Sequence, residues 1–312
     1  MSQSSRAAVE SSATFRRHRY RSRTFHPAVR SSAPAVCSSA PAAILLLPVS
    51  VKVGVKVSVK AERKPSDMAA RFLFFFDFDE TLIAENSDNS VIRAAPFQEL
   101  PPSLSRINHT GYFLEHTQNI MTFLNKCGVT EDALSTALQQ VPPSPGVSAL
   151  LDFLSARGDF ECIVVSDANS YFIETWLRHI GVHKLFTKVL TNPADFDAHG
   201  RLVLHPFHTH SCAKCPVNMC KQTILRDYTS KREKERGKPF QKIFYIGDGE
   251  NDICPTLALG QNDVVFPRRG FPMHRFIQDL QKTQLGMYKP SVVPWERGED
   301  VVDFLKKVLQ EQ

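Results

Sequence analysis

The hydrophobic and polar positions of the chain follow a regular order from about residue 70 onward, where short apolar runs alternate with segments of helical periodicity. The first run, residues 71–76, lacks polar alternation, which is typical of a strand buried on both faces at the centre of a parallel sheet. Further strands are predicted at 160–165, 188–190, 243–246 and 264–266. Because helical segments separate these strands, we expect right-handed crossovers and a Rossmann-like parallel α/β sheet.

Residues 83–145 carry few strand signals and show helical spacing instead. One helix is predicted to end at Gly128, and the next ends before Pro142 and Pro143. We therefore expect a small helical cap at about 83–145, inserted after the first strand of a domain that spans residues 70–312.

Local signals predict further boundaries. Ser144 and Pro145 are interpreted as the N-cap and the first residue of a helix. A hairpin is expected to turn at His199-Gly200. A helix is predicted at about 218–230, the charged stretch Lys231–Lys238 after it is interpreted as an exposed loop, and the last helix is predicted at about 299–309.

Residues 1–69 are rich in Ser, Ala, Pro and Arg without sustained periodicity, so we exclude them from the fold. Residues 1–60 hold ten Lys and Arg residues and a single acid, Glu10. This composition leaves two alternatives, a disordered extension and a targeting segment. Because the rest of the chain is close to neutral, no nucleic-acid partner is expected. The apolar run 42–51 is too short to span a bilayer, which needs about 20 residues.

The seven cysteines are an odd number and do not form a disulfide framework. Such usage favours a reducing compartment, so a cytoplasmic location is expected.

Polar clusters follow three of the predicted strands. Since parallel strands present their carboxyl ends at one edge of the sheet, where ligands bind, these clusters should lie together. Crowded carboxylates need a cation, and an all-oxygen donor set suits Mg²⁺. The three clusters are Asp77/Asp79/Thr81, Ser166/Asp167 and Asp248/Asp252.

This arrangement suits phosphoryl transfer. One of the first two aspartates can attack phosphorus and form an aspartyl-phosphate, and the other can act as general acid and base. Ser166 and a lysine would hold the phosphate oxygens. Lys221, at the start of a predicted helix, is favoured as that lysine, and Lys214 is the alternative.

The pattern resembles the haloacid dehalogenase superfamily of phosphatases over about residues 71–270. Its Asp-x-Asp-x-Thr motif is matched at Asp77–Thr81, its hydroxyl after a strand at Ser166, and its Gly-Asp-Gly-x-Asn-Asp motif at Gly247–Asp252. The resemblance implies that Asp77 is the nucleophile and Asp79 the acid/base. It also implies that Asp77, the Asp79 backbone carbonyl and Asp248 hold Mg²⁺, with Asp252 in support. Glu80 replaces the commoner Gly of the first motif and is expected to face away from the catalytic pair.

Longer stretches resemble vertebrate phosphoethanolamine/phosphocholine phosphatases. They are Asp77–Leu82 with Glu85–Asp88, Ser166–Asn169, His208–Cys215 and Phe266–Gly270. The resemblance implies that Asp88 and Asp167 contact the substrate, and it links the chain to mineralisation of bone and cartilage and to matrix vesicles. Negative charge at these two positions suits a cationic head group.

Other functions stay open at this point. A related enzyme would act on another small phosphomonoester such as pyridoxal 5′-phosphate, and a protein of another class would bind phosphate without catalysis. A small phosphomonoester is the expected partner, and the oligomeric state is not fixed.

A group of soft ligands precedes Lys221 in the sequence. It could hold a structural Zn²⁺, or it could be a packed loop that positions Lys221. Its members are His208, His210, Cys212, Cys215 and Cys220.

Overall fold

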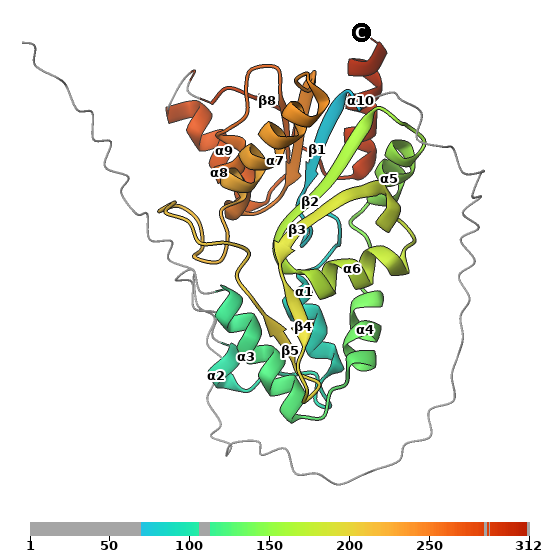
Figure 1. Ribbon diagram of the computed structural model, residues 1–312, viewed down its shortest axis with the longest axis vertical. Coiled ribbons are helices and arrows are strands. Elements are labelled where there is room, and N and C mark those ends of the chain that lie inside the picture. Colours follow the sequence, from blue (N-terminus) through green and yellow to red (C-terminus); the bar gives the residue numbers. More distant parts are fainter. Residues whose placement is uncertain (1–69, 106–112, 284–285, 287, 311–312) are drawn as a thin grey trace, which may run out of the picture. The chain divides into compact units, whose positions relative to one another are not determined.

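The computed structural model describes residues 70–105, 113–283, 286 and 288–310, and the expected extension at 1–69 lies outside them. Six parallel strands form the main sheet of the described chain, in the order β3-β2-β1-β6-β7-β8 (Figure 1). The prediction of a parallel α/β sheet is confirmed. The strands are β1 Phe72–Phe76, β2 Phe160–Asn169, β3 Phe186–Asn192, β6 Lys242–Gly247, β7 Val264–Pro267 and β8 Ser291–Val292.

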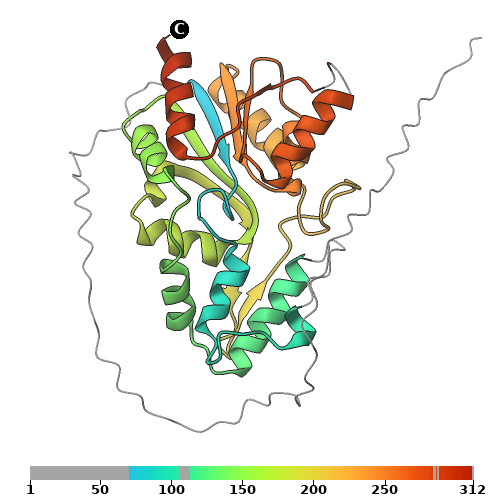
Figure 2. The ribbon, with the colours of Figure 1, turned by 180° about the vertical axis from the view of Figure 1, so that it is seen from behind.

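Strand β1 buries both of its faces. Phe72, Phe74 and Phe76 pack into one hydrophobic cluster with α5 (Val147–Ser155), α6 (Ser170–His179) and α10 (Gly298–Gln310). Leu73 and Phe75 pack into a second cluster with α7 (Lys221–Arg236) and α9 (Pro272–Thr283). Figure 1 and, from behind, Figure 2 show α7 and α9 on the opposite side of the sheet from α5 and α10. Helices on both faces explain why the run contains no polar alternation.

The segment after β1 and a later hairpin share a third hydrophobic cluster. Gln118 links them, since its side-chain amide donates to the Leu202 carbonyl oxygen at 3.1 Å and accepts from the Leu204 N–H at 2.8 Å. The turn of the hairpin contains His199-Gly200, as expected. The elements are α1 Ser87–Ser90, a 3₁₀ turn Val91–Ala94, α2 Pro102–Ser105, α3 Phe113–Lys126, α4 Glu131–Gln139, β4 Ala194–Phe196 and β5 Leu202–Leu204.

Helix α7 contradicts one sequence prediction. It continues to Arg236 and ends at Gly237, whose φ of 67° is left-handed, so the expected loop at Lys231–Lys238 is wrong. Arg232 explains the difference, because its guanidinium donates to both oxygens of Glu161 on β2, at 2.7 and 2.9 Å. It also pairs with Glu235 one turn away. The ion pairs of Arg232 therefore stabilise the end of α7 and connect this helix to β2.

Helix α5 starts two residues later than the sequence predicts. Its N-cap is Gly146, with φ of 72°, and its first residue is Val147. The Ser144 hydroxyl donates instead to the Ile83 carbonyl oxygen at 2.8 Å. The predicted cap is therefore wrong, because Ser144 ties the segment that follows β1 to the start of α5.

The remaining short elements are the 3₁₀ turns His183–Leu185 and Glu250–Asp252 and helix α8, Ile253–Thr256. Within the described ranges, every helix is too short or too polar to cross a membrane.

Candidate active site

Asp77 occupies the first position after β1. Its N–H donates to the Ile246 carbonyl oxygen of β6 at 3.0 Å. This bond extends the pairing of β1 with β6 by one residue, to Asp77. The side chain is buried. Burial and the nearby charge of Asp252 raise the pKa of Asp77 well above its ordinary value.

Three carboxylates from two strand ends meet here. Oxygen atoms of Asp77, Asp248 and Asp252 all lie within 4.8 Å of one another. The Thr81 hydroxyl donates to Asp248 Oδ1 at 3.1 Å. Burial and the charges of Asp77 and Asp252 raise the pKa of Asp248 to about 9. The site is therefore short of positive charge.

Lys221 is the cation that the chain itself supplies to this cluster. It is the first residue of α7, and its Nζ donates to Asp77 Oδ1 and Asp252 Oδ1, both at 2.7 Å. Burial would lower the pKa of Lys221, but the charges of Asp252 and Asp77 raise it above its ordinary value. Lys214 lies elsewhere, since its charge acts on Cys254. The structure thus brings Lys221 to the cluster, and the alternative Lys214 to the cysteines.

Both oxygens of Asp252 are engaged by the protein. Its Oδ1 accepts from Lys221 and from the Tyr245 hydroxyl, the latter at 2.6 Å. Its Oδ2 accepts from the N–H groups of Asp248 and Gly249, at 3.1 and 3.0 Å. A carboxylate used in this way supports its neighbours and has little capacity left to ligate an ion. Tyr245 lies inside β6 with no sequence signal of this role.

The donor set fits Mg²⁺. With all three carboxylates ionised and Lys221 protonated, the cluster retains two uncompensated negative charges. A divalent cation with oxygen ligands would balance them. The carboxylates of Asp77 and Asp248 are best placed to hold the ion, because both oxygens of Asp252 already accept hydrogen bonds from the protein.

Asp79 lies two residues after Asp77. Its Oδ1 accepts from the Ser87 N–H at 2.8 Å, at the start of α1. Burial and the charge of Asp88 raise the pKa of Asp79 well above its ordinary value. A raised pKa favours the protonated carboxyl, which is the form that acts as a general acid.

Ser166 and Asp167 lie in the last half of β2, which runs four residues beyond the predicted strand. Ser166 is buried, and its hydroxyl oxygen accepts from the Ala168 N–H at 3.3 Å. The charge of Asp167 contributes to the raised pKa values of Asp77, Asp79 and Asp88. Asp167 therefore lies close enough to all three to act on them electrostatically.

Asp88 projects from α1 toward α3. The Thr117 hydroxyl donates to its Oδ2 at 2.7 Å. Its Oδ1 is shielded from solvent and has no hydrogen-bond partner in the described part of the chain. Burial raises the pKa of Asp88 to about 6, and the charge of Asp167 adds to the increase. Thr117 lies 29 residues from Asp88 along the chain, so no local pattern indicates this contact.

The predicted soft-ligand group separates into two parts. Sulfur atoms of Cys212, Cys215 and Cys220 come together with Cys254, a residue outside the predicted group. His208 and His210 instead accept hydrogen bonds from backbone N–H groups of the loop. The four cysteines form a second group of potential ligands, distinct from the carboxylates of Asp77, Asp248 and Asp252.

The family model described as "Putative Phosphatase" matches residues 72–309. A "Probable phosphatase phospho1" of Danio rerio is 48% identical over 261 residues, covering 82% of this chain and 94% of the relative. The "Phosphoethanolamine/phosphocholine phosphatase" of Homo sapiens is 47% identical over 264 residues, covering 84% and 97%. The "Pyridoxal phosphate phosphatase PHOSPHO2" of Rattus norvegicus is 39% identical over 241 residues, covering 77% and 99%.

Among solved structures, a phospho-aspartyl intermediate analogue of phosphoserine phosphatase superposes with a TM-score of 0.50 at 15% identity, covering 76% of this chain and 99% of that chain. At this identity the likeness shows the fold alone.

Proposed function

The chain belongs to the "Putative Phosphatase" family and is a phosphatase of the haloacid dehalogenase fold, and from this premise we propose that it hydrolyses phosphoethanolamine and phosphocholine with Mg²⁺ as cofactor. The products would be inorganic phosphate and the amino alcohol. By its resemblance to phosphatases of mineralising tissue, we place the enzyme in the cytoplasm or in matrix vesicles, supplying phosphate for mineral.

The unpaired oxygen of Asp88 carries the substrate proposal. A shielded carboxylate oxygen without a donor is costly unless a ligand supplies one. Asp167 adds a second negative charge beside it. Two carboxylates near the acid/base Asp79 favour an ammonium or trimethylammonium on the leaving group, and the human relative is named for such substrates.

Under this proposal, Asp77 attacks phosphorus and forms an aspartyl-phosphate while the bond to the leaving oxygen breaks. Asp79 gives its proton to that oxygen. Asp79 then takes a proton from water, which attacks phosphorus and releases Asp77. Lys221 and Ser166 bind the phosphate oxygens throughout. Bound by Asp77, the Asp79 carbonyl and Asp248, with Asp252 in support, Mg²⁺ would supply positive charge against the phosphate.

A phosphate-release screen with purified full-length chain tests the proposal. It compares phosphoethanolamine, phosphocholine, ethyl phosphate and pyridoxal 5′-phosphate, each in Mg²⁺ and in EDTA. We expect the two amines to give the highest kcat/KM and EDTA to abolish release. Preference for pyridoxal 5′-phosphate would favour the activity named for the PHOSPHO2 relatives. Binding of phosphate without turnover of any ester would indicate a non-catalytic protein.

A further inference from the structure

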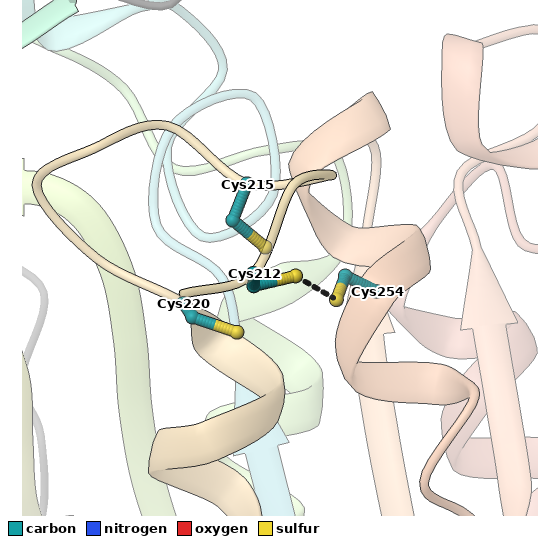
Figure 3. A group of neighbouring side chains, drawn as sticks. All are labelled: Cys212, Cys215, Cys220 and Cys254. Carbon is teal, nitrogen blue, oxygen red and sulfur yellow. Dashed lines mark hydrogen bonds between the residues drawn. The ribbon is translucent and has the colours of Figure 1, made fainter. Parts of the chain in front are cut away.

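The side chains of four cysteines converge beside the sheet, and the proposed reaction uses none of them. The sulfur atoms of Cys212, Cys215, Cys220 and Cys254 all lie within 4.8 Å of one another (Figure 3). Cys220 and Cys254 are buried, and the other two are partly buried. Four thiols gathered from separate segments into one small volume match the composition of a closed tetrahedral metal site.

The cluster joins two parts of the fold. Cys212 and Cys215 lie in the loop between β5 and α7, and Cys220 is the N-cap of α7. Cys254 lies on α8 and points toward the loop from the other side (Figure 3). Cys254 lies far from the other three cysteines in the sequence, which explains why the predicted group does not include it.

The two histidines shape the loop instead of joining the cluster. Nε2 of His208 accepts from the Cys220 N–H at 2.9 Å. Nδ1 of His210 accepts from the Cys212 N–H at 3.1 Å, and its other ring nitrogen lies 2.7 Å from the Pro216 carbonyl oxygen. Both rings therefore hold the backbone of a cysteine in place, as supporting residues commonly do around metal ligands.

The sulfur geometry suits a metal better than a disulfide. Sγ of Cys212 lies 3.8 Å from Sγ of Cys254. A disulfide needs about 2.05 Å, whereas four sulfurs at about 2.3 Å from a tetrahedral zinc ion are about 3.8 Å apart.

We propose that Cys212, Cys215, Cys220 and Cys254 bind one structural Zn²⁺ ion. Binding displaces the thiol protons to solvent and leaves four thiolates around one Zn²⁺, a site with two net negative charges. The nearby charge of Lys214 partly offsets them. Soft thiolates exclude Mg²⁺, so the zinc site and the carboxylate site remain distinct.

The zinc site would hold two residues of the carboxylate cluster in position. Lys221 directly follows Cys220, and Asp252 precedes Cys254 by two residues. Their side chains meet at 2.7 Å. An ion that joins Cys220 to Cys254 therefore fixes the start of α7 against α8, and with it the pair formed by Lys221 and Asp252.

Metal content of the full-length chain, expressed with zinc and purified without chelators, tests the site independently of activity. We expect about one zinc per chain. Refolding with Co²⁺ should give the thiolate-to-cobalt charge-transfer absorption and the strong visible bands of a tetrahedral site. Cys212→Ser and Cys215→Ser should each lose zinc and this spectrum, whereas Cys127→Ser, outside the cluster, should keep both.

The positioning role has its own measurement. If zinc is withdrawn from the folded wild-type protein by a thiol-directed mercurial and a chelator, kcat should fall more than KM rises, and reduction with added Zn²⁺ should restore it. Wild-type protein that contains no zinc and gives no thiolate–cobalt absorption would overturn the proposal. Peptide mapping that finds a disulfide between Cys212 and Cys254 in freshly purified protein would also overturn it.

Discussion

The ammonium group of Lys221 lies 2.7 Å from Oδ1 of Asp77, and both side chains are almost completely buried. The same ammonium lies 2.7 Å from Asp252. A buried ion pair of this kind contributes little net stability as a whole, but removal of one partner leaves the other charge uncompensated. Lys221 is therefore expected to matter for the folded state as well as for phosphate binding.

Lys221→Met should lower the free energy of unfolding by about 3–5 kcal/mol in EDTA, because two buried carboxylates lose their cation. Mg²⁺ should restore part of this stability by supplying charge. The activity should stay reduced by a factor on the order of 100 or more, since no group replaces the ammonium at the phosphate. Urea unfolding with and without Mg²⁺, and initial rates, measure both effects.

Lys214→Met is the matched control, because Lys214 was the alternative lysine from sequence. It should lose less than about tenfold in kcat, the factor that corresponds to 1.4 kcal/mol. If Lys214→Met were inactive and Lys221→Met active, the assignment of the phosphate-binding lysine would be reversed.

Asp77→Asn and Asp79→Asn should separate the two proposed catalytic roles. Asp77→Asn removes the nucleophile. Turnover should therefore vanish, and no phosphoenzyme should be recovered after acid quenching. Asp79→Asn removes the proton donor whose pKa is raised by burial and by Asp88, and kcat should fall by about 10²–10⁴. Acid quenching with radiolabelled substrate measures the phosphoenzyme, and circular dichroism checks the fold. Full activity in either variant contradicts the mechanism.

Asp88 should make substrate preference depend on pH. Its pKa is raised to about 6, so the carboxylate is charged above that pH and neutral below it. The ratio of kcat/KM for phosphoethanolamine to that for ethyl phosphate should therefore fall as the pH drops through about 6. Titration of the substrates themselves is the same for wild type and for an Asp88 variant, so comparison of the two proteins isolates the contribution of Asp88.

Asp88→Asn should flatten this pH profile and lower the ratio to its low-pH value, with a smaller effect on ethyl phosphate. A raised pKa means that the folded protein loses stability as the pH rises through about 6, so the variant should also be more stable than wild type at pH 7. An unchanged ratio in Asp88→Asn would remove this residue from head-group recognition.

Polar residues that follow an apolar run closely were predictable from sequence. Asp77, Asp79, Ser166 and Asp248 come after apolar runs, and parallel strands bring such positions to one edge. Thr117 and Cys254 were not predictable in the same way. Each meets its partner through the packing of separate elements, and neither carries a local pattern that names the partner.

The charged stretch at the end of α7 has few apolar residues, so hydrophobic periodicity does not predict that it is helical. Its helix is stabilised by Arg232, whose partner Glu161 lies 71 residues away on β2. Burial would raise the pKa of Glu161, but hydrogen bonds from Arg232 and Tyr228 lower it below its ordinary value. A tertiary ion pair thus decided a boundary that periodicity could not locate.

Arg232→Ala should therefore destabilise the fold by about 1–3 kcal/mol, because Glu161 loses its charged donors. The lowered pKa of Glu161 means that the contribution is present at neutral pH and is lost as the pH falls through the folded-state pKa. Lys231→Ala is the control, since its exposed pair with Glu235 at 3.9 Å should be worth less than about 1 kcal/mol. Equal losses in urea unfolding would contradict the anchoring role.

Glu80, whose charge acts on Asp248, allows a test of backbone strain near the carboxylate cluster. Its φ of 52° is left-handed, a conformation that costs a non-glycine residue about 1–2 kcal/mol. Its backbone keeps both partners whatever the side chain, because its N–H donates to the Glu85 carbonyl oxygen and its own carbonyl accepts from Arg268. Allowing for the chain entropy of glycine, Glu80→Gly should raise the free energy of unfolding by about 0.5–1 kcal/mol.

Glu80→Ala separates strain from charge, because alanine keeps the strained backbone and loses the carboxylate. The charge of Glu80 contributes to the raised pKa of Asp248, so both variants should lower that pKa equally. Only the glycine variant should gain stability from relieved strain, and urea unfolding in EDTA measures the difference between the two. If alanine stabilises the protein as much as glycine does, the benefit comes from removing a negative charge beside Asp248, and the left-handed backbone at Glu80 is not under strain.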